Sequence, residues 1–103
     1  MAEIEHWDTT RDGPLSETAM RRKLEARGYI VTHYVYPPGT YFPEHHHSVD
    51  KIDAVLAGRF RMKMGDQIAV LEAGDCLEVP NGVVHSAEVM GEISVVSLDA
   101  VKI

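Results

Sequence analysis

The sequence predicts an all-β domain, an antiparallel sandwich or barrel, preceded by one short helix. After Gly28 the chain consists of short runs rich in β-branched and aromatic residues. Glycine-containing turns separate these runs at regular intervals, which is typical of antiparallel sheets and not of parallel sheets with crossover helices. Apolar residues at helical spacing occur before Gly28, where they form a single short segment.

The helix is predicted over residues 15–27. Ser16 is a suitable N-cap, and Glu17 places a negative charge in the first turn, where the helix dipole favours it. Gly28 can end the helix because glycine adopts the backbone conformation that follows a last turn. We therefore divide the chain into an N-terminal segment, residues 1–28, whose helix packs on the barrel, and a β-barrel over residues 29–103.

The predicted strands share a short length, a β-branched or aromatic composition and a turn signal at each end. They are Tyr29–Tyr36, Lys51–Ala57, Arg59–Met64, Gln67–Leu71, Cys76–Val79, Ser86–Val89 and Ile93–Val101. In the run from Arg59, charged and apolar residues alternate, so one face is solvated and the other buried. Met62 and Met64 lie on the buried face, where they fill the core or, alternatively, line a small-molecule pocket.

The bulk composition excludes several classes of partner. The chain has 103 residues, a single-domain length, and a formal net charge of −6. Nucleic acids and anionic membranes bind basic surfaces, so neither is an expected partner. The single cysteine, Cys76, allows no disulfide within the chain and is expected to be a small buried residue. The first residues are polar without a secretory pattern, and no apolar run could span a bilayer, so a cytoplasmic protein is expected.

Three histidines are the most informative residues. His45 and His47 are two apart, so in a strand both side chains would share a face, while His46 between them would face the surface. His85 follows the turn that Pro80 and Gly82 predict. Histidine is the commonest neutral metal ligand, so convergence of these three would form a metal site.

Two segments of this sequence resemble the paired motifs of the cupin superfamily, and together they span residues 39–89. The shared positions are three histidines, four glycines and one proline, namely His45, His47, His85, Gly39, Gly58, Gly74, Gly82 and Pro80. The resemblance implies a jelly-roll β-barrel with both motifs lining its open end. It also implies that His45, His47 and His85 bind a divalent transition metal, either Zn, Ni, Fe or Mn.

The resemblance fails at one position, where cupins usually supply a glutamate ligand and this chain has Lys51. An ammonium offers no lone pair and repels a cation. The three histidines could bind metal alone, with Lys51 held off by Asp50 or Asp53. Alternatively, Asp53 or Asp50 could replace the glutamate as a ligand. In a third interpretation no metal binds, and Lys51 and the histidines bind an anionic or carbonyl ligand.

Function is left open between two main classes. The first is a metal-dependent enzyme on a small organic substrate, with Lys51, Asp53, Asp50 and Met62 as residues that support the metal or contact the substrate. The second is a non-catalytic small-molecule or metal-binding module, such as a sensor; a barrel with purely structural histidines ranks behind both. Small cupins are commonly dimers, so a homodimer is expected, with residues 29–36 and 93–103 as candidate interface strands.

Overall fold

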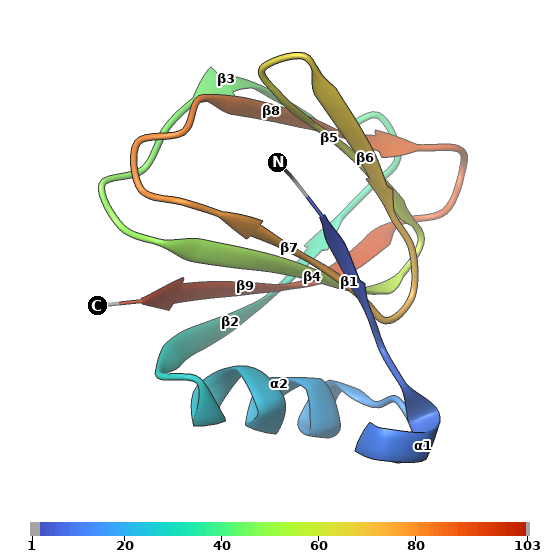
Figure 1. The fold of residues 1–103 in the computed structure, drawn as a ribbon. Helices are drawn as coiled ribbons and strands as arrows, with labels where there is room; N and C mark the ends of the chain where they lie inside the picture. The colour runs from blue at the N-terminus through green and yellow to red at the C-terminus, as the bar shows by residue number, and fades with distance from the viewer. Residues whose placement is uncertain (1–2, 103) are drawn as a thin grey trace.

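Two antiparallel sheets packed face to face form the molecule (Figure 1). This computed structural model describes residues 3–102. Its elements are β1 Ile4–His6, α1 Thr9–Asp12, α2 Glu17–Ala26, β2 Tyr29–Tyr36, β3 Tyr41–His45, β4 Lys51–Ala57, β5 Arg59–Met64, β6 Gln67–Leu71, β7 Asp75–Val79, β8 His85–Met90 and β9 Val95–Lys102. The strand order is β1-β7-β4-β9-β2 in one sheet and β3-β8-β5-β6 in the other.

The all-β, jelly-roll prediction is confirmed, with one correction to its shape. No strand pair joins the two sheets within residues 3–102, so they form an open sandwich and not a closed barrel. Seven predicted strands are present, and four of them have the predicted bounds: β2, β4, β5 and β6. The glycine turns explain this success, because each one ends a run of β-forming residues where the chain must reverse.

The N-terminal residues are more structured than predicted. β1 pairs with β7 at the edge of the five-stranded sheet, and the single turn α1 precedes the predicted helix. The predicted helix is α2, with Ser16 Oγ accepting a hydrogen bond from the Ala19 amide as its N-cap. Neither helix in the described residues is long and apolar enough to cross a membrane.

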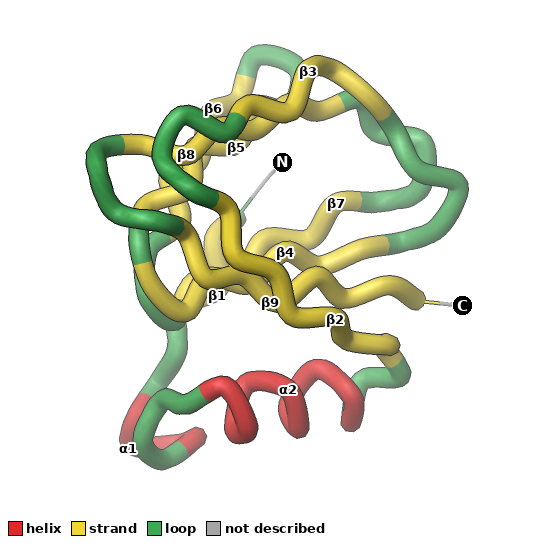
Figure 2. Tube along the Cα trace, turned by 180° about the vertical axis from the view of Figure 1, so that it is seen from behind, coloured by secondary structure: helices red, strands yellow, loops and turns green. Residues whose placement is uncertain are grey.

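Two hydrophobic clusters lie on opposite faces of the five-stranded sheet. One fills the space between the sheets and consists of Val55, Phe60, Met62, Ala69, Leu71, Leu77, Val79, Ala87, Val89 and Val95. The other packs the sheet against α2 and consists of Met20, Leu24, Val31, Ile52, Ala54, Cys76, Leu98 and Ala100. Figure 2 shows α2 lying along the outer face of this sheet. Cys76 is buried in the second cluster, as expected, and burial raises the pKa of its thiol to about 12.

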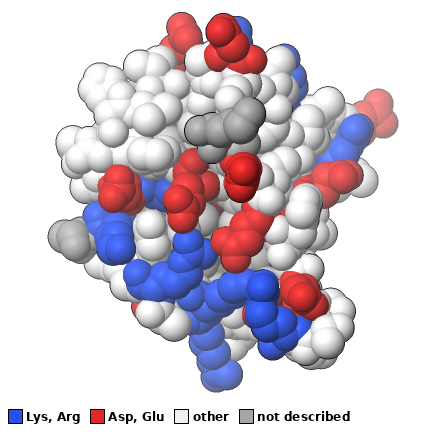
Figure 3. All heavy atoms as spheres, in the orientation of Figure 1, with Lys and Arg blue, Asp and Glu red and all other residues white. Residues whose placement is uncertain are grey.

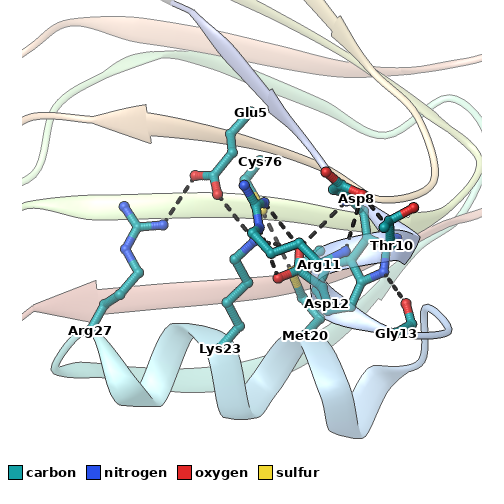
Figure 4. Close-up of polar contacts among 11 residues, drawn as sticks. Glu5, Asp8, Thr10, Arg11, Asp12, Gly13, Met20, Lys23, Arg27 and Cys76 are labelled. Carbon is teal, nitrogen blue, oxygen red and sulfur yellow. Dashed lines mark hydrogen bonds and ion pairs between the residues drawn. The ribbon is translucent and has the colours of Figure 1, made fainter.

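Ion pairs connect α2 and the residue that ends it to α1, β1 and β7. Lys23 Nζ lies 2.8 Å from Asp12 and 3.3 Å from Glu5, and Arg27 contacts Glu5 (Figure 4). Arg27 also contacts Glu78. Figure 3 shows the same arrangement at the surface, with basic side chains gathered over the helix and acidic side chains directly above them. These contacts fix the short N-terminal strand, which has too few residues to pair stably alone.

Candidate metal centre

Three histidine side chains from two segments meet at one point. His45 is the last residue of β3 and His85 the first of β8, and the two are cross-strand partners. His47 follows in the loop after β3. One ligand atom from each ring can be chosen so that all three lie within 4.8 Å of one another. The ring centroids are 4.2 Å apart for His45 and His85, 4.9 Å for His45 and His47, and 5.2 Å for His47 and His85.

Two of the rings are oriented by backbone carbonyls. His45 Nδ1 lies 2.7 Å from the Pro43 carbonyl oxygen, and His85 Nδ1 lies 2.9 Å from that of Val83. A carbonyl oxygen can only accept a hydrogen bond, so each Nδ1 carries the hydrogen and donates it. Each Nε2 then keeps its lone pair free, which is the tautomer that a metal requires.

Pro43 contributes to this geometry through its place in the sheet. β3 is an edge strand, where a residue without an N–H group is tolerated, and its register against β8 shifts between Phe42 and His45. The irregular strand leaves the Pro43 carbonyl available to the His45 ring.

His47 reaches the cluster by a route that strand periodicity does not describe. Because β3 ends at His45, a loop places His47, and the Gly82 amide donates a 2.8 Å hydrogen bond to the His47 carbonyl. Its Nε2 is buried and has no hydrogen-bond partner within the described residues. Burial lowers the pKa of His47, and the Lys51 charge lowers it further. His46 is exposed.

Lys51 lies in the same interior, between two carboxylates. Its Nζ is 2.6 Å from Asp99 Oδ1 and 3.7 Å from Asp53 Oδ1. Lys51 and Asp53 are each only 8% exposed. The contact with Asp99 is a short ion pair. Burial alone would lower the pKa of Lys51, but the two carboxylates outweigh it and raise that pKa, which keeps the side chain charged.

A cavity of about 290 Å³ connects the histidines to this triad of Lys51, Asp53 and Asp99. Its remaining walls are mostly aromatic and apolar: Tyr34, Tyr36, Phe42, Phe60, Met62 and Ala87. The Tyr36 ring stacks on Phe60 and meets Phe42 edge to face. Burial raises the pKa of Tyr36 above its usual value, so its hydroxyl stays neutral and can donate a hydrogen bond. This volume suits a small organic ligand.

The structure brings most of the sequence-predicted site residues together. Lys51, Asp53 and Met62 line the cavity with the three histidines. Asp50 does not line it; its exposed carboxylate accepts a hydrogen bond from the Asn81 amide and so stabilises the turn before β8. Sequence reasoning missed Asp99 and Tyr36. For Asp99 a signal existed, because polar Ser97 and Asp99 alternate with apolar residues in β9.

The histidines fit a transition metal. All three can present a neutral imidazole nitrogen to one point, and the buried Nε2 of His47 has no hydrogen-bond partner in the part of the chain that the structure describes. A buried polar atom without a partner is costly, and a metal ion would satisfy it. Among the described residues, the ligand atoms that lie within 4.8 Å of one another come from the three histidines. This group does not include the carboxylates of Asp53 and Asp99.

The buried Asp53 predicts a pH dependence of stability in the metal-free protein. Burial raises its pKa to about 7, and the Asp99 charge adds to this while Lys51 opposes it. Because the folded-state pKa lies above that of the unfolded chain, the stabilising contribution is complete below about pH 4 and is lost as the pH rises through about 7. Between about pH 5 and pH 8, the unfolding free energy of the wild type should therefore fall by on the order of 2 kcal/mol more than that of Asp53→Asn. Urea denaturation at several pH values measures this, and parallel curves for the two proteins would contradict it.

Comparison with known proteins agrees with the fold. A family model described as the cupin domain matches residues 32–101. The structure of KdgF from Halomonas sp. is similar with a TM-score of 0.64 at 21% identity, over 74% of this chain and 71% of that one. An RmlC-like cupin from Shewanella frigidimarina has a TM-score of 0.63 at 26% identity, over 72% of this chain and 65% of that one. The DMSP lyase DddQ from Ruegeria pomeroyi has a TM-score of 0.66 at 25% identity, over 73% of this chain.

This chain is shorter than several of these proteins. It spans 38% of the DMSP lyase and 61% of a similar Streptococcus pyogenes protein of unknown function. A search of curated protein sequences found no match.

Proposed function

This chain belongs to the cupin family, and from that premise we propose that His45, His47 and His85 bind one divalent transition metal ion that acts on a small organic ligand in the adjoining cavity. The observation that carries the proposal is the convergence of three imidazoles. Two of them have Nδ1 atoms anchored by carbonyls, and the third has a buried Nε2 without a hydrogen-bond partner among the described residues. A metal ion with only three protein ligands keeps positions open and polarises ligand oxygen atoms there.

The protein's own side chains define the rest of the site. The aromatic wall formed by Tyr36, Phe42 and Phe60 would pack against the apolar part of a ligand and exclude water. The neutral Tyr36 hydroxyl can donate a hydrogen bond to a ligand oxygen. Asp53, with its pKa raised to about 7, can hold or release a proton near neutral pH, as a general acid or base must.

We favour an enzyme over a passive binding protein because of the raised pKa of Asp53. A carboxyl group with a pKa near neutrality, inside a cavity beside a metal site, is a typical feature of catalytic sites. The DMSP lyases among the similar structures also support an enzymatic use of the site. A non-catalytic binding or sensor module is the second candidate, and one observation favours it: both carboxylates near the histidines are paired with Lys51.

Metal titration tests the proposal. Protein purified without an affinity tag, stripped with a chelator and titrated with Zn²⁺, Ni²⁺, Mn²⁺ or Fe²⁺ should bind one ion per chain. Elemental analysis of the unstripped protein should give the same stoichiometry. Failure of all four ions to bind would contradict the proposed function. Proton NMR of the loaded protein with small oxo- and hydroxycarboxylates then separates the candidates, because an enzyme produces new resonances and a binding module does not.

We also propose a homodimer formed through β2. β2 lies at the edge of the five-stranded sheet. The other candidate interface segment, residues 93–103, contains β9, which is paired on both sides, by β4 and by β2. Its last residue, Ile103, lies outside the described residues. β2 contains no lysine or proline, and its register against β9 is regular, so it lacks the devices that protect edges from pairing. Its residues Ile30 and Val35 are 55% and 54% exposed.

The homodimer predicts a mass of twice 11.5 kDa by light scattering. Val35→Lys places a charge on the exposed outer face of β2 and should shift the protein to the monomer, since charged edge residues oppose pairing. The matched control is Ile68→Lys, an equally exposed residue on the edge strand β6, which should leave the mass unchanged. A monomeric wild type would contradict the proposal.

A further inference from the structure

Lys51 occupies an unfavourable place for a cation. It lines the same cavity as the three histidines, and its charge is the second largest influence that lowers the pKa of His47. A side chain with four rotatable bonds could turn its ammonium toward the imidazoles, where it would repel a metal ion. Something must therefore hold Lys51 in place if these histidines bind metal.

Asp99 is in position to do so. It lies on β9, beside β4, and its cross-strand partner in the register is Asp53. The 2.6 Å contact from Asp99 Oδ1 to Lys51 Nζ draws the ammonium toward the five-stranded sheet, whereas His45 and His85 belong to the opposite sheet. Asp53 supports the same orientation from 3.7 Å.

The charges of the three residues add to the argument. When Asp53 is ionised, one ammonium and two carboxylates carry a net charge of −1, so the wall beside the histidines then attracts a cation although it contains a lysine. Without Asp99, the same wall would carry no net charge, and the ammonium would be free to move. Asp99 therefore affects a bound cation in two ways, through its own charge and through the position of Lys51.

We propose that Asp99 is a positioning residue that holds the Lys51 ammonium away from the histidine cluster and so permits a divalent cation to bind there. This inference rests on the proposed metal-binding function. It assigns to Asp99, on β9, the role that the sequence suggested for Asp50 or Asp53, and Asp99 is not itself a ligand.

A double-mutant cycle on metal affinity tests it. Dissociation constants for Zn²⁺ are measured by chelator competition for the wild type, Asp99→Asn, Lys51→Met and the double variant. Asp99→Asn has two effects on Zn²⁺ affinity. The first, the loss of the negative charge, should weaken binding to a similar extent with or without Lys51. Release of Lys51 should add a further weakening of about tenfold or more, seen only when Lys51 is present.

The outcomes separate the inference from the proposed function. Asp99→Asn should weaken binding by about 100-fold in the wild-type background and by less than about tenfold in the Lys51→Met background. Equal effects in the two backgrounds would overturn the inference and leave metal binding intact. A wild type that binds no metal at all would overturn the proposed function, and the inference with it.

Two controls keep the cycle informative. Asp50→Asn removes a charge of the same sign from the residue next to Lys51, but Asp50 is exposed and contacts the Asn81 amide instead, so affinity should change less than about threefold. Thermal unfolding checks that each variant folds. If Asp99→Asn does not fold, the cycle uses Asp53→Asn, the second contact of Lys51, and the same comparison of backgrounds decides.

Discussion

Replacement of His47 by alanine should abolish stoichiometric metal retention, with the dissociation constant raised more than about 100-fold. Loss of partners that merely orient a ligand already costs 10- to 100-fold in metal affinity, so loss of one of only three ligands should cost more. The reason lies in the geometry, since the His47 ring lies 4.9 and 5.2 Å from the other two rings and its buried Nε2 has no hydrogen-bond partner among residues 3–102. Elemental analysis of the purified variant and chelator competition measure the effect.

His46→Ala is the matched control. His46 precedes His47 directly, carries the same ring and is exposed, so its loss should leave both metal content and affinity unchanged. Equal losses in the two variants would show that the loop, and not the His47 ring, is responsible. Normal retention in His47→Ala would remove this residue from the ligand set.

The histidine cluster was predictable from the sequence, but the reason for its geometry was not. The turn signal at Pro80 and Gly82 correctly places His85 at the start of a strand. β3 was not among the predicted strands, and because it ends at His45, a loop positions His47. The hydrogen bond from the Gly82 amide to the His47 carbonyl brings the loop against the turn before β8. Such a contact between segments far apart in the chain has no signature in local periodicity.

Local sequence patterns also could not identify Asp99 as the residue that pairs with Lys51 in the cavity wall. Its alternation with Leu98 and Ala100 in β9 places its side chain on the face opposite to theirs, but its partner depends on β9 lying between β4 and β2. Strand order is a tertiary property, so local patterns could suggest Asp50 or Asp53 as the partner of Lys51 but not Asp99. The strand β1 was missed for a related reason, because three residues are too few to show a period.

The turn between β4 and β5 is where a single methyl group should have a large effect on stability. Gly58 adopts a φ of +80°, and a Cβ there would lie 2.5 Å from the Ser94 carbonyl oxygen and 3.0 Å from Val95 Cα. Both obstacles are backbone atoms, which cannot rotate away as a side chain can. Gly58 therefore combines an unfavourable backbone conformation for other residues with a close approach to the start of β9.

Gly58→Ala should consequently lower the unfolding free energy by about 2–5 kcal/mol, the sum of left-handed backbone strain and overpacking. Gly39→Ala is the matched control, because Gly39 has a φ of +86° but open space around its Cβ position, so it should lose only about 1–2 kcal/mol. The melting temperature of Gly58→Ala should fall by roughly 10–20 °C, and clearly further than that of the control. Equal losses would mean that the contact with Ser94 relaxes at no cost, and that β9 is held less rigidly against this turn than its buried residues indicate.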